Sequence, residues 1–174
     1  YKPVGWRSMA PLMDGPYSMQ VYFTCLKACQ SKMLDLGEGR WVDSHDNLVF
    51  HLGGSPKFVK HAFEQAASDG LDAELAESEL EKRFGRLVLP SLPLAQRIGM
   101  MHTSAAYVNL CSLLLHAQPE RIGVFSFGSG AACTMYHLRV RGEVRVDKSI
   151  LRRLDERKHL NATEFTDALA RYSS

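Results

Sequence analysis

The sequence predicts a layered α/β domain in which helices cover a mixed sheet. Apolar residues recur at three- and four-residue steps over 18–36 and again over 103–116, as in amphipathic helices. Two short apolar runs, 48–52 and 122–126, are rich in strand formers and are expected to be the central strands. The stretch 132–146 alternates apolar with polar residues and is expected to be a hairpin neighbour of the second strand. Alternation of helices and strands is typical of layered α/β domains.

The boundaries of the first elements follow from turn and capping residues. Residues 13–18 read Met-Asp-Gly-Pro-Tyr-Ser, a turn composition, and Ser18 is expected to cap the helix that follows. The run 47–54 predicts a buried strand whose end carries His51. The next helix is expected to begin after Ser55, with this serine as its cap and a proline at the first helical position.

Three further segments complete the predicted element order. Residues 73–84 are rich in charged side chains and predict a solvated surface helix. The stretch 88–96 contains two prolines and is expected to be irregular. Two short helical patterns close the chain, and the last is expected to begin near Thr163, with Asn161 or Thr163 as its cap.

Length, charge and hydropathy exclude several classes of protein. A chain of 174 residues fits one domain, and its net charge of +2 comes from scattered basic residues, which argues against nucleic-acid binding. No apolar run approaches the roughly 20 residues of a membrane span, and no signal peptide is evident. We therefore expect a cytoplasmic protein. The chain begins at Tyr1 in what reads as an interior segment, so we expect a fragment of a longer protein.

The cysteines show no metal-ligand or redox spacing. We expect buried, reduced thiols and no metal site. The four cysteines are Cys25, Cys29, Cys111 and Cys133.

The Gly-Ser-Gly stretch at 128–130 admits three interpretations. It approaches the dinucleotide fingerprint, but Cys133 stands in the last place and a strand pattern follows where that fingerprint needs a helix. A nucleophile elbow requires glycine two places before the serine, and Phe127 stands there. A bend remains, where missing side chains let a loop or a ligand approach the backbone.

His51 is the candidate functional residue that its position singles out. It ends a buried strand before a Gly-Gly turn, where α/β sheets place functional groups, although a histidine that only packs is the simpler alternative. Lys57 and Lys60 open the next helix, where cations oppose the helix dipole unless an anion such as a phosphate is near. A solvated helix face would also explain them. Four other histidines are assigned to the surface or to packing: His102, His116, His137 and His159.

Three long segments resemble one family in the right order. They are YKPVGWRSMAPLMDGPYSMQVYF (1–23), LVFHLGGSPKFVKHAF (48–63) and RIGVFSFGSGAACTMYHLRV (121–140). Together they are similar to the C-terminal half of hydroxymethylglutaryl-CoA synthase. Residues 101–114 and 154–172 resemble later segments of that family, so the similarity covers essentially the whole chain.

The resemblance implies that residues 1–174 form the C-terminal domain of a thiolase-like acyltransferase. Such enzymes have two similar halves in α-β-α-β-α layers and join acetyl-CoA to acetoacetyl-CoA in the mevalonate pathway of isoprenoid biosynthesis. Their nucleophilic cysteine and general acid/base glutamate would lie upstream of Tyr1, so the chain alone is expected to be inactive. The resemblance also implies a homodimer, with coenzyme A thioesters as substrates and no separate cofactor.

The resemblance also assigns individual residues. His51 corresponds to the histidine that helps to hold the acetoacetyl thioester and donates to its carbonyl. Positions that contact coenzyme A or substrate correspond to Ser18, Lys57 and Ser129. The family's second lysine falls at His61.

One departure from the family pattern affects the expected activity. Where the family has Gly-Asn-x-Tyr-Thr, residues 99–103 read Gly-Met-Met-His-Thr, so Met100 replaces an asparagine that donates a hydrogen bond. Loss of one such donor typically costs about 2.7–4 kcal/mol of barrier. A non-catalytic binding or dimerisation module is therefore one alternative. A β-branching synthase that acts on carrier-protein thioesters is another.

Overall fold

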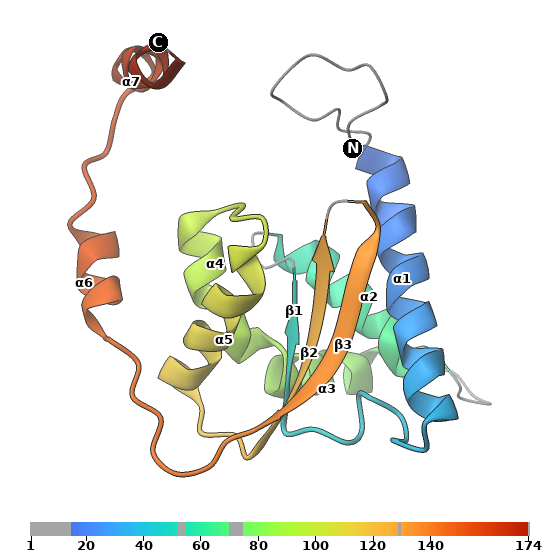
Figure 1. Cartoon of the computed structure of the whole chain (residues 1–174). Helices are drawn as coiled ribbons and strands as arrows, with labels where there is room; N and C mark the ends of the chain where they lie inside the picture. Colours follow the sequence, from blue (N-terminus) through green and yellow to red (C-terminus); the bar gives the residue numbers. More distant parts are fainter. Residues whose placement is uncertain (1–14, 52–54, 70–74, 129, 174) are drawn as a thin grey trace.

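The computed structural model describes residues 15–51, 55–69, 75–128 and 130–173, and in them a mixed sheet of three strands. The strands are β1 (Asn47–Phe50), β2 (Arg121–Gly128) and β3 (Ala132–Arg139), in the order β1-β2-β3. β1 pairs with β2 in parallel, and β2 pairs with β3 antiparallel (Figure 1). This arrangement confirms the predicted mixed sheet and the predicted hairpin.

Helices cover both faces of the sheet, which confirms the predicted layers (Figure 1). On one face lie α1 (Gly15–Asp35), α2 (Pro56–Ser68) and α3 (Glu77–Leu87). On the other lies α5 (Ser104–His116), with α4 (Pro93–Ile98) packed against it. Leu48 and Phe50 of β1 join the first core, whereas Val49 joins the second, as the period of a strand requires.

A close approach between β2 and the loop before β1 depends on glycine. A Cβ at Gly123 would lie 2.5 Å from Nε1 of Trp41 and 2.9 Å from a methyl carbon of Leu48. No side chain other than hydrogen fits there without displacing the indole. Gly123 therefore lets Trp41, which is 1% exposed, pack directly against the middle strand.

Two predictions about the strands need correction. β2 alone is central among the described strands, and β1 lies at the edge of the sheet, although helices bury all four of its residues. β3 ends at Arg139 rather than continuing to 146. The chain turns at Gly142, whose φ of 78° is a conformation that glycine adopts without strain.

Two predictions about the middle helices were also wrong. α3 is not only a solvated helix, because Phe84 and Leu87 on its inner face are buried in the core. The stretch 88–96 is not irregular, since it forms the 3₁₀ helix η1 (Leu89–Ser91) and most of α4. Each proline occupies the first turn of its helix, where no amide donor is needed, so these prolines begin helices rather than interrupt them.

The predicted helix caps had mixed outcomes. Ser18 lies within the first turn of α1 rather than before it, because Pro16 fits the first turn of a helix. Ser55 occupies the N-cap position of α2 as predicted, but its side chain makes no capping hydrogen bond. Asn161 does cap α7 (Ala162–Ser173), since its Oδ1 accepts a hydrogen bond from the Glu164 amide at 2.9 Å.

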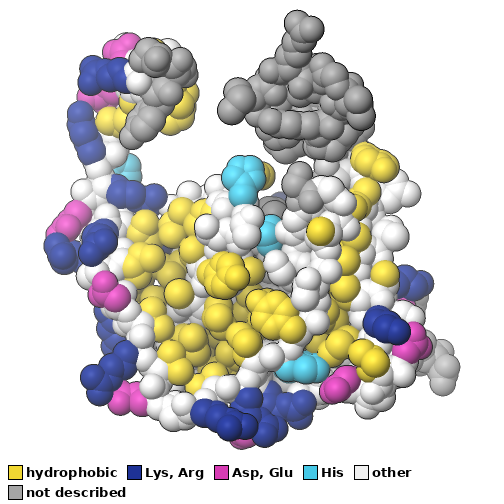
Figure 2. Space-filling view, viewed as in Figure 1, with side chains coloured by type: hydrophobic (Ala, Val, Ile, Leu, Met, Phe, Trp, Pro, Cys, Tyr) yellow, Lys and Arg dark blue, Asp and Glu magenta, His cyan; other side chains and the backbone are white. Residues whose placement is uncertain are grey.

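The C-terminal segment extends away from the layered body (Figure 1). It contains α6 (Ser149–Asp155) and α7, and an ion pair of 2.5 Å between Arg97 and Asp155 connects α6 to α4. Figure 2 shows hydrophobic side chains gathered on the face formed by α5 and the strands. Tyr107 of α5 is 63% exposed. None of the helices in the described residues is both long and apolar enough to cross a membrane.

Candidate functional site

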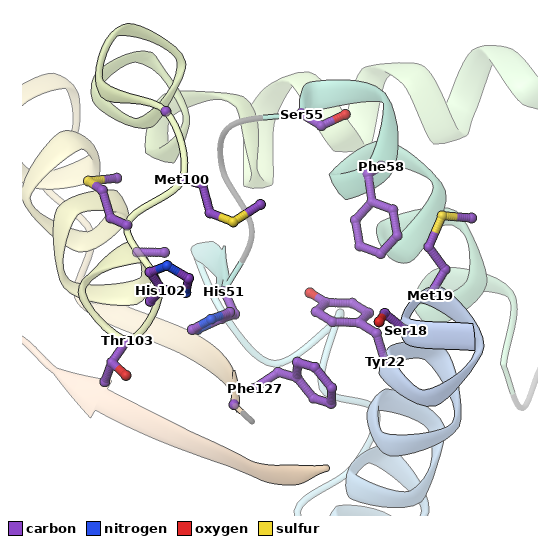
Figure 3. A pocket seen from close by; sticks show the side chains of 14 residues that line it. Ser18, Met19, Tyr22, His51, Ser55, Phe58, Met100, His102, Thr103 and Phe127 are labelled. Atoms are coloured by element: carbon purple, nitrogen blue, oxygen red, sulfur yellow. The ribbon is translucent and has the colours of Figure 1, made fainter. Parts of the chain in front are cut away.

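A cavity of about 610 Å³ opens beyond the carboxyl ends of β1 and β2 (Figure 3). Because these strands are parallel, their carboxyl ends meet at one edge, where ligand sites of open α/β sheets lie. His51 follows β1 there, and Phe127 and Gly128 end β2. The remaining walls come from the first two turns of α1, the start of α2 with its N-cap, residues 99–103 and the start of α5.

His51 is a buried imidazole on the floor of this cavity. It is 6% exposed, and its Nδ1 has no hydrogen-bond partner among the described residues. Burial, and to a lesser extent the neighbouring His102, lowers the pKa of His51 below its ordinary value of 6.5. At neutral pH the ring is therefore uncharged, with one N–H donor and one acceptor nitrogen. Asn109 of α5 donates to the Phe50 carbonyl at 2.8 Å and holds the backbone next to His51.

Tyr22 of α1 forms the wall opposite His51, and aromatic rings hold it on several sides. Its ring makes edge-to-face contacts with Phe58, Phe125 and Phe127 at centroid distances of 5.0, 5.2 and 5.2 Å. The side chain is 1% exposed, and its hydroxyl also has no hydrogen-bond partner in the described part of the chain. Burial raises the pKa of Tyr22, so the hydroxyl keeps its proton.

The loop before α5 brings Met100 and His102 to the cavity. Gly99 and His102 both have positive φ, at 92° and 50°, and this unusual backbone places His102 beside His51 (Figure 3). The sequence assigned His102 to the surface or to packing. It is exposed, but it also lines the cavity. Met100 is 67% exposed and presents to the cavity a thioether, which donates no hydrogen bond.

The structure brings two of the site residues expected from the sequence into this cavity, Ser18 and His51. Lys57 and His61 are exposed on α2 and are not among the residues that line it. The ring of His61 instead contacts Phe23 edge-to-face at 5.0 Å. Ser129 lies outside the described residues. The roles expected for these five residues stay predictions.

Lys60, one place before His61 on α2, forms ion pairs away from the cavity. It forms ion pairs with Glu81 and, at 3.8 Å, with Glu64. The hydrogen bond with Glu81 raises the pKa of Lys60. These contacts agree with the interpretation of Lys60 as part of a solvated helix face.

The cysteines are less buried than the sequence suggested. Cys111 is exposed on α5, because it lies on the side of the helix that faces away from the core, and the other three are partly buried. All four are thiols, as expected. In the described ranges, no group of three or more His, Cys, Asp or Glu side chains could hold a metal ion.

Comparisons with known proteins agree on one family. Residues 59–174 match the family model described as hydroxymethylglutaryl-coenzyme A synthase C terminal. The mitochondrial hydroxymethylglutaryl-CoA synthase of Sus scrofa is 30% identical over 97% of this chain and 44% of its own length. The curacin biosynthetic pathway HMG synthase, solved in complex with apo donor-ACP, is 26% identical with a TM-score of 0.83 over 94% of this chain and 42% of its own. MvaS, solved in complex with 3-hydroxy-3-methylglutaryl coenzyme A, is 28% identical with a TM-score of 0.59 over 89% of this chain and 41% of its own.

The layered mixed sheet, with its cavity at the strand ends, defines a domain of the thiolase-like fold, which its structural neighbours share. The chain belongs to the hydroxymethylglutaryl-CoA synthase family and matches its C-terminal part. It spans less than half the length of the relatives named above.

Proposed function

We propose that this chain forms the acceptor-thioester side of a hydroxymethylglutaryl-CoA synthase, which condenses acetyl-CoA with acetoacetyl-CoA. The observation that carries the proposal is the neutral, buried His51 at the floor of the cavity. Its N–H donates to the ketone oxygen of the acetoacetyl group and stabilises the negative charge that develops there when the carbon–carbon bond forms. The nucleophilic cysteine and the acid/base glutamate come from a second, N-terminal half of the enzyme.

The chemistry of the cavity wall fits the acyl end of such a thioester. None of the described residues that line the cavity is Lys, Arg, Asp or Glu, which suits the uncharged acyl and pantetheine parts of the substrate. Ser55 and Phe58 line the cavity from the first turn of α2, and Lys57 lies exposed on that same turn. The phosphates of coenzyme A would extend outward past Lys57 and His61, with Ser18 nearer the acyl end. Ser129 stays a contact expected from the resemblance alone.

Binding and turnover of the purified chain test this proposal. We expect acetoacetyl-CoA to bind in isothermal titration calorimetry and His51→Ala to weaken it by about two- to tenfold, the value of one hydrogen bond. With both thioesters present, the chain alone should release no condensation product, because the nucleophile is absent. Product from the chain alone, or equal binding by His51→Ala, would contradict the proposal.

Met100→Asn provides a test in the opposite direction. An amide at this position restores a hydrogen-bond donor, so we expect acetoacetyl-CoA to bind about two- to tenfold more tightly. Met101→Asn is the matched control, since Met101 lines the same cavity at the next position. If both variants change the affinity equally, the effect is one of polarity and not of the restored donor.

The second candidate is a β-branching synthase that takes carrier-protein thioesters. Its support is the similarity to the curacin pathway enzyme, whose structure contains a donor-ACP. A preference for an acetoacetyl carrier protein over acetoacetyl-CoA in the same binding measurement would favour it. A homodimer and a cytoplasmic location belong to the proposal for the whole protein. The location stays a prediction, because the Sus scrofa relative is named as mitochondrial.

A further inference from the structure

Two buried polar atoms without partners border the same cavity. They are Nδ1 of His51 and the hydroxyl of Tyr22, and neither has a hydrogen-bond partner among the described residues. A buried hydroxyl without a partner costs free energy, so native proteins usually supply one from the protein, from water or from a ligand. Figure 3 shows the Tyr22 hydroxyl pointing into the cavity, on the side where His51 and Met100 lie.

We propose that Tyr22 is a second hydrogen-bond donor to the acceptor ketone, acting together with His51. The proposal rests on the proposed function and adds a catalytic residue to it. Both groups donate to the same oxygen, and no proton is transferred. Two donors at one developing oxyanion are a common arrangement in acyl-transfer sites.

The surroundings of Tyr22 make it a fixed donor. Phe58, Phe125 and Phe127 contact its ring edge-to-face, so the ring cannot rotate away without breaking these contacts. Rings occupy these sides, and Tyr22 lines the cavity on another side. Burial raises the pKa of Tyr22, which keeps the O–H intact at neutral pH. A donor held in place before the ligand arrives loses little conformational entropy on binding.

The test is Tyr22→Phe, which removes one oxygen atom and leaves the ring. We expect acetoacetyl-CoA to bind about two- to tenfold more weakly, since one hydrogen bond is lost. We also expect the urea midpoint of the free chain to stay the same or rise, because an unpartnered buried hydroxyl has been removed. A residue that only supported the fold would lower the midpoint instead. Tyr107→Phe is the matched control, since Tyr107 is 63% exposed and lies outside the cavity.

A spectroscopic measurement adds a readout of the ketone itself. With acetoacetyl-CoA labelled with ¹³C at the ketone, binding to the chain should shift that carbon downfield, and Tyr22→Phe should reduce the shift. Normal binding and an unchanged shift in Tyr22→Phe would overturn the role of Tyr22 and leave the proposed function intact. If the unmodified chain does not bind acetoacetyl-CoA, both proposals fail.

A separate observation concerns two cysteines on neighbouring elements. Cys29 of α1 and Cys133 of β3 place their sulfur atoms 3.5 Å apart, and α1 packs beside β3 (Figure 1). A disulfide needs a separation of about 2.05 Å, so the two thiols are in contact and not bonded. Cys25 lies one helical turn before Cys29, and its thiol faces the Ala131 carbonyl at 3.7 Å.

We infer that Cys29 and Cys133 form a reversible disulfide with glutathione disulfide as the oxidant. One protein thiolate attacks a sulfur of glutathione disulfide and releases one glutathione. The second protein thiolate then displaces the other glutathione, and the two thiol protons pass to the two glutathiones. The bond would link α1 to β3 close to Phe127, which pairs with Cys133 across the hairpin and lines the cavity. Burial raises the pKa of Cys29 to about 12, so the exchange should accelerate with rising pH.

Peptide mapping tests this inference without reference to the proposed function. Trypsin places each cysteine in its own peptide: 8–27, 28–32, 98–121 and 122–139. After incubation of the chain with glutathione disulfide and alkylation of the remaining thiols, we expect peptides 28–32 and 122–139 to be linked. Cys29→Ser should abolish the link, and Cys111→Ser should leave it, since Cys111 is exposed on α5. A link from 8–27 to 122–139, or glutathione adducts without any link, would overturn the inference.

Discussion

His102 lowers the pKa of His51 in the cavity. Because His102 lowers the pKa of His51 through its charge, His102→Gln should raise the pKa of His51 toward 6.5. The value should stay below 6.5, since burial is the larger cause and the substitution leaves it in place. A pH titration of the His51 ring by NMR measures this change.

His159→Gln is the matched control for that titration, because His159 is exposed at the C-terminal end of the chain. It should leave the pKa of His51 unchanged. If His102→Gln also leaves it unchanged, the two rings do not interact, and the lowered pKa comes from burial alone.

At the scale of elements, the contact between β2 and Trp41, in the loop before β1, limits which side chains fit at position 123. Gly123→Ala would place a methyl group 2.5 Å from the indole nitrogen, so either the indole or the strand must shift. We expect the free energy of unfolding to fall by about 1–3 kcal/mol, as for other overpacked cores. Urea unfolding followed by tryptophan fluorescence measures this loss.

Gly85→Ala on α3 is the corresponding control. A Cβ at Gly85 meets nothing within 4 Å, and alanine favours the helix. The free energy of unfolding should rise by up to about 1 kcal/mol. Equal effects of the two alanine substitutions would show that the indole contact does not limit β2.

At the scale of the whole molecule, two buried histidines make stability depend on pH. Burial is the largest cause of the lowered pKa of both His45 and His51. Between these lowered values and about 6.5, the unfolded chain binds more protons than the folded chain, so stability decreases as pH falls through this window. Each histidine contributes a slope of at most about 1.4 kcal/mol per pH unit.

Urea unfolding measured across this window tests the dependence on pH. His51→Asn should make the slope shallower without abolishing it, because His45 remains. A slope that does not change in this variant would assign the whole dependence on pH to other groups.

Some parts of the site follow from local sequence, and others depend on distant contacts. The position of His51 could be predicted because a buried strand followed by glycines is a local pattern. Tyr22 matches the apolar period of its helix, and only the packed structure shows that its side chain lines a cavity. The position of His102 depends on a positive φ that composition does not reveal. The prolines of η1 and α4 suggested an irregular segment, because composition alone does not distinguish a proline in the first turn of a helix from one that interrupts a helix.

The parallel pairing of β1 with β2 also has a consequence during synthesis of the chain. Asp46, just before β1, accepts a hydrogen bond from the amide of Arg121, the first residue of β2, 75 positions later. Since β1 lies at the edge of the described sheet, its only described strand partner is β2. On the ribosome, this pairing forms only after residues 121–125 have left the exit tunnel, so the apolar side chains of β1 stay unpaired with β2 until then. A nascent chain of intermediate length should be the form that chaperones bind and that aggregates most readily.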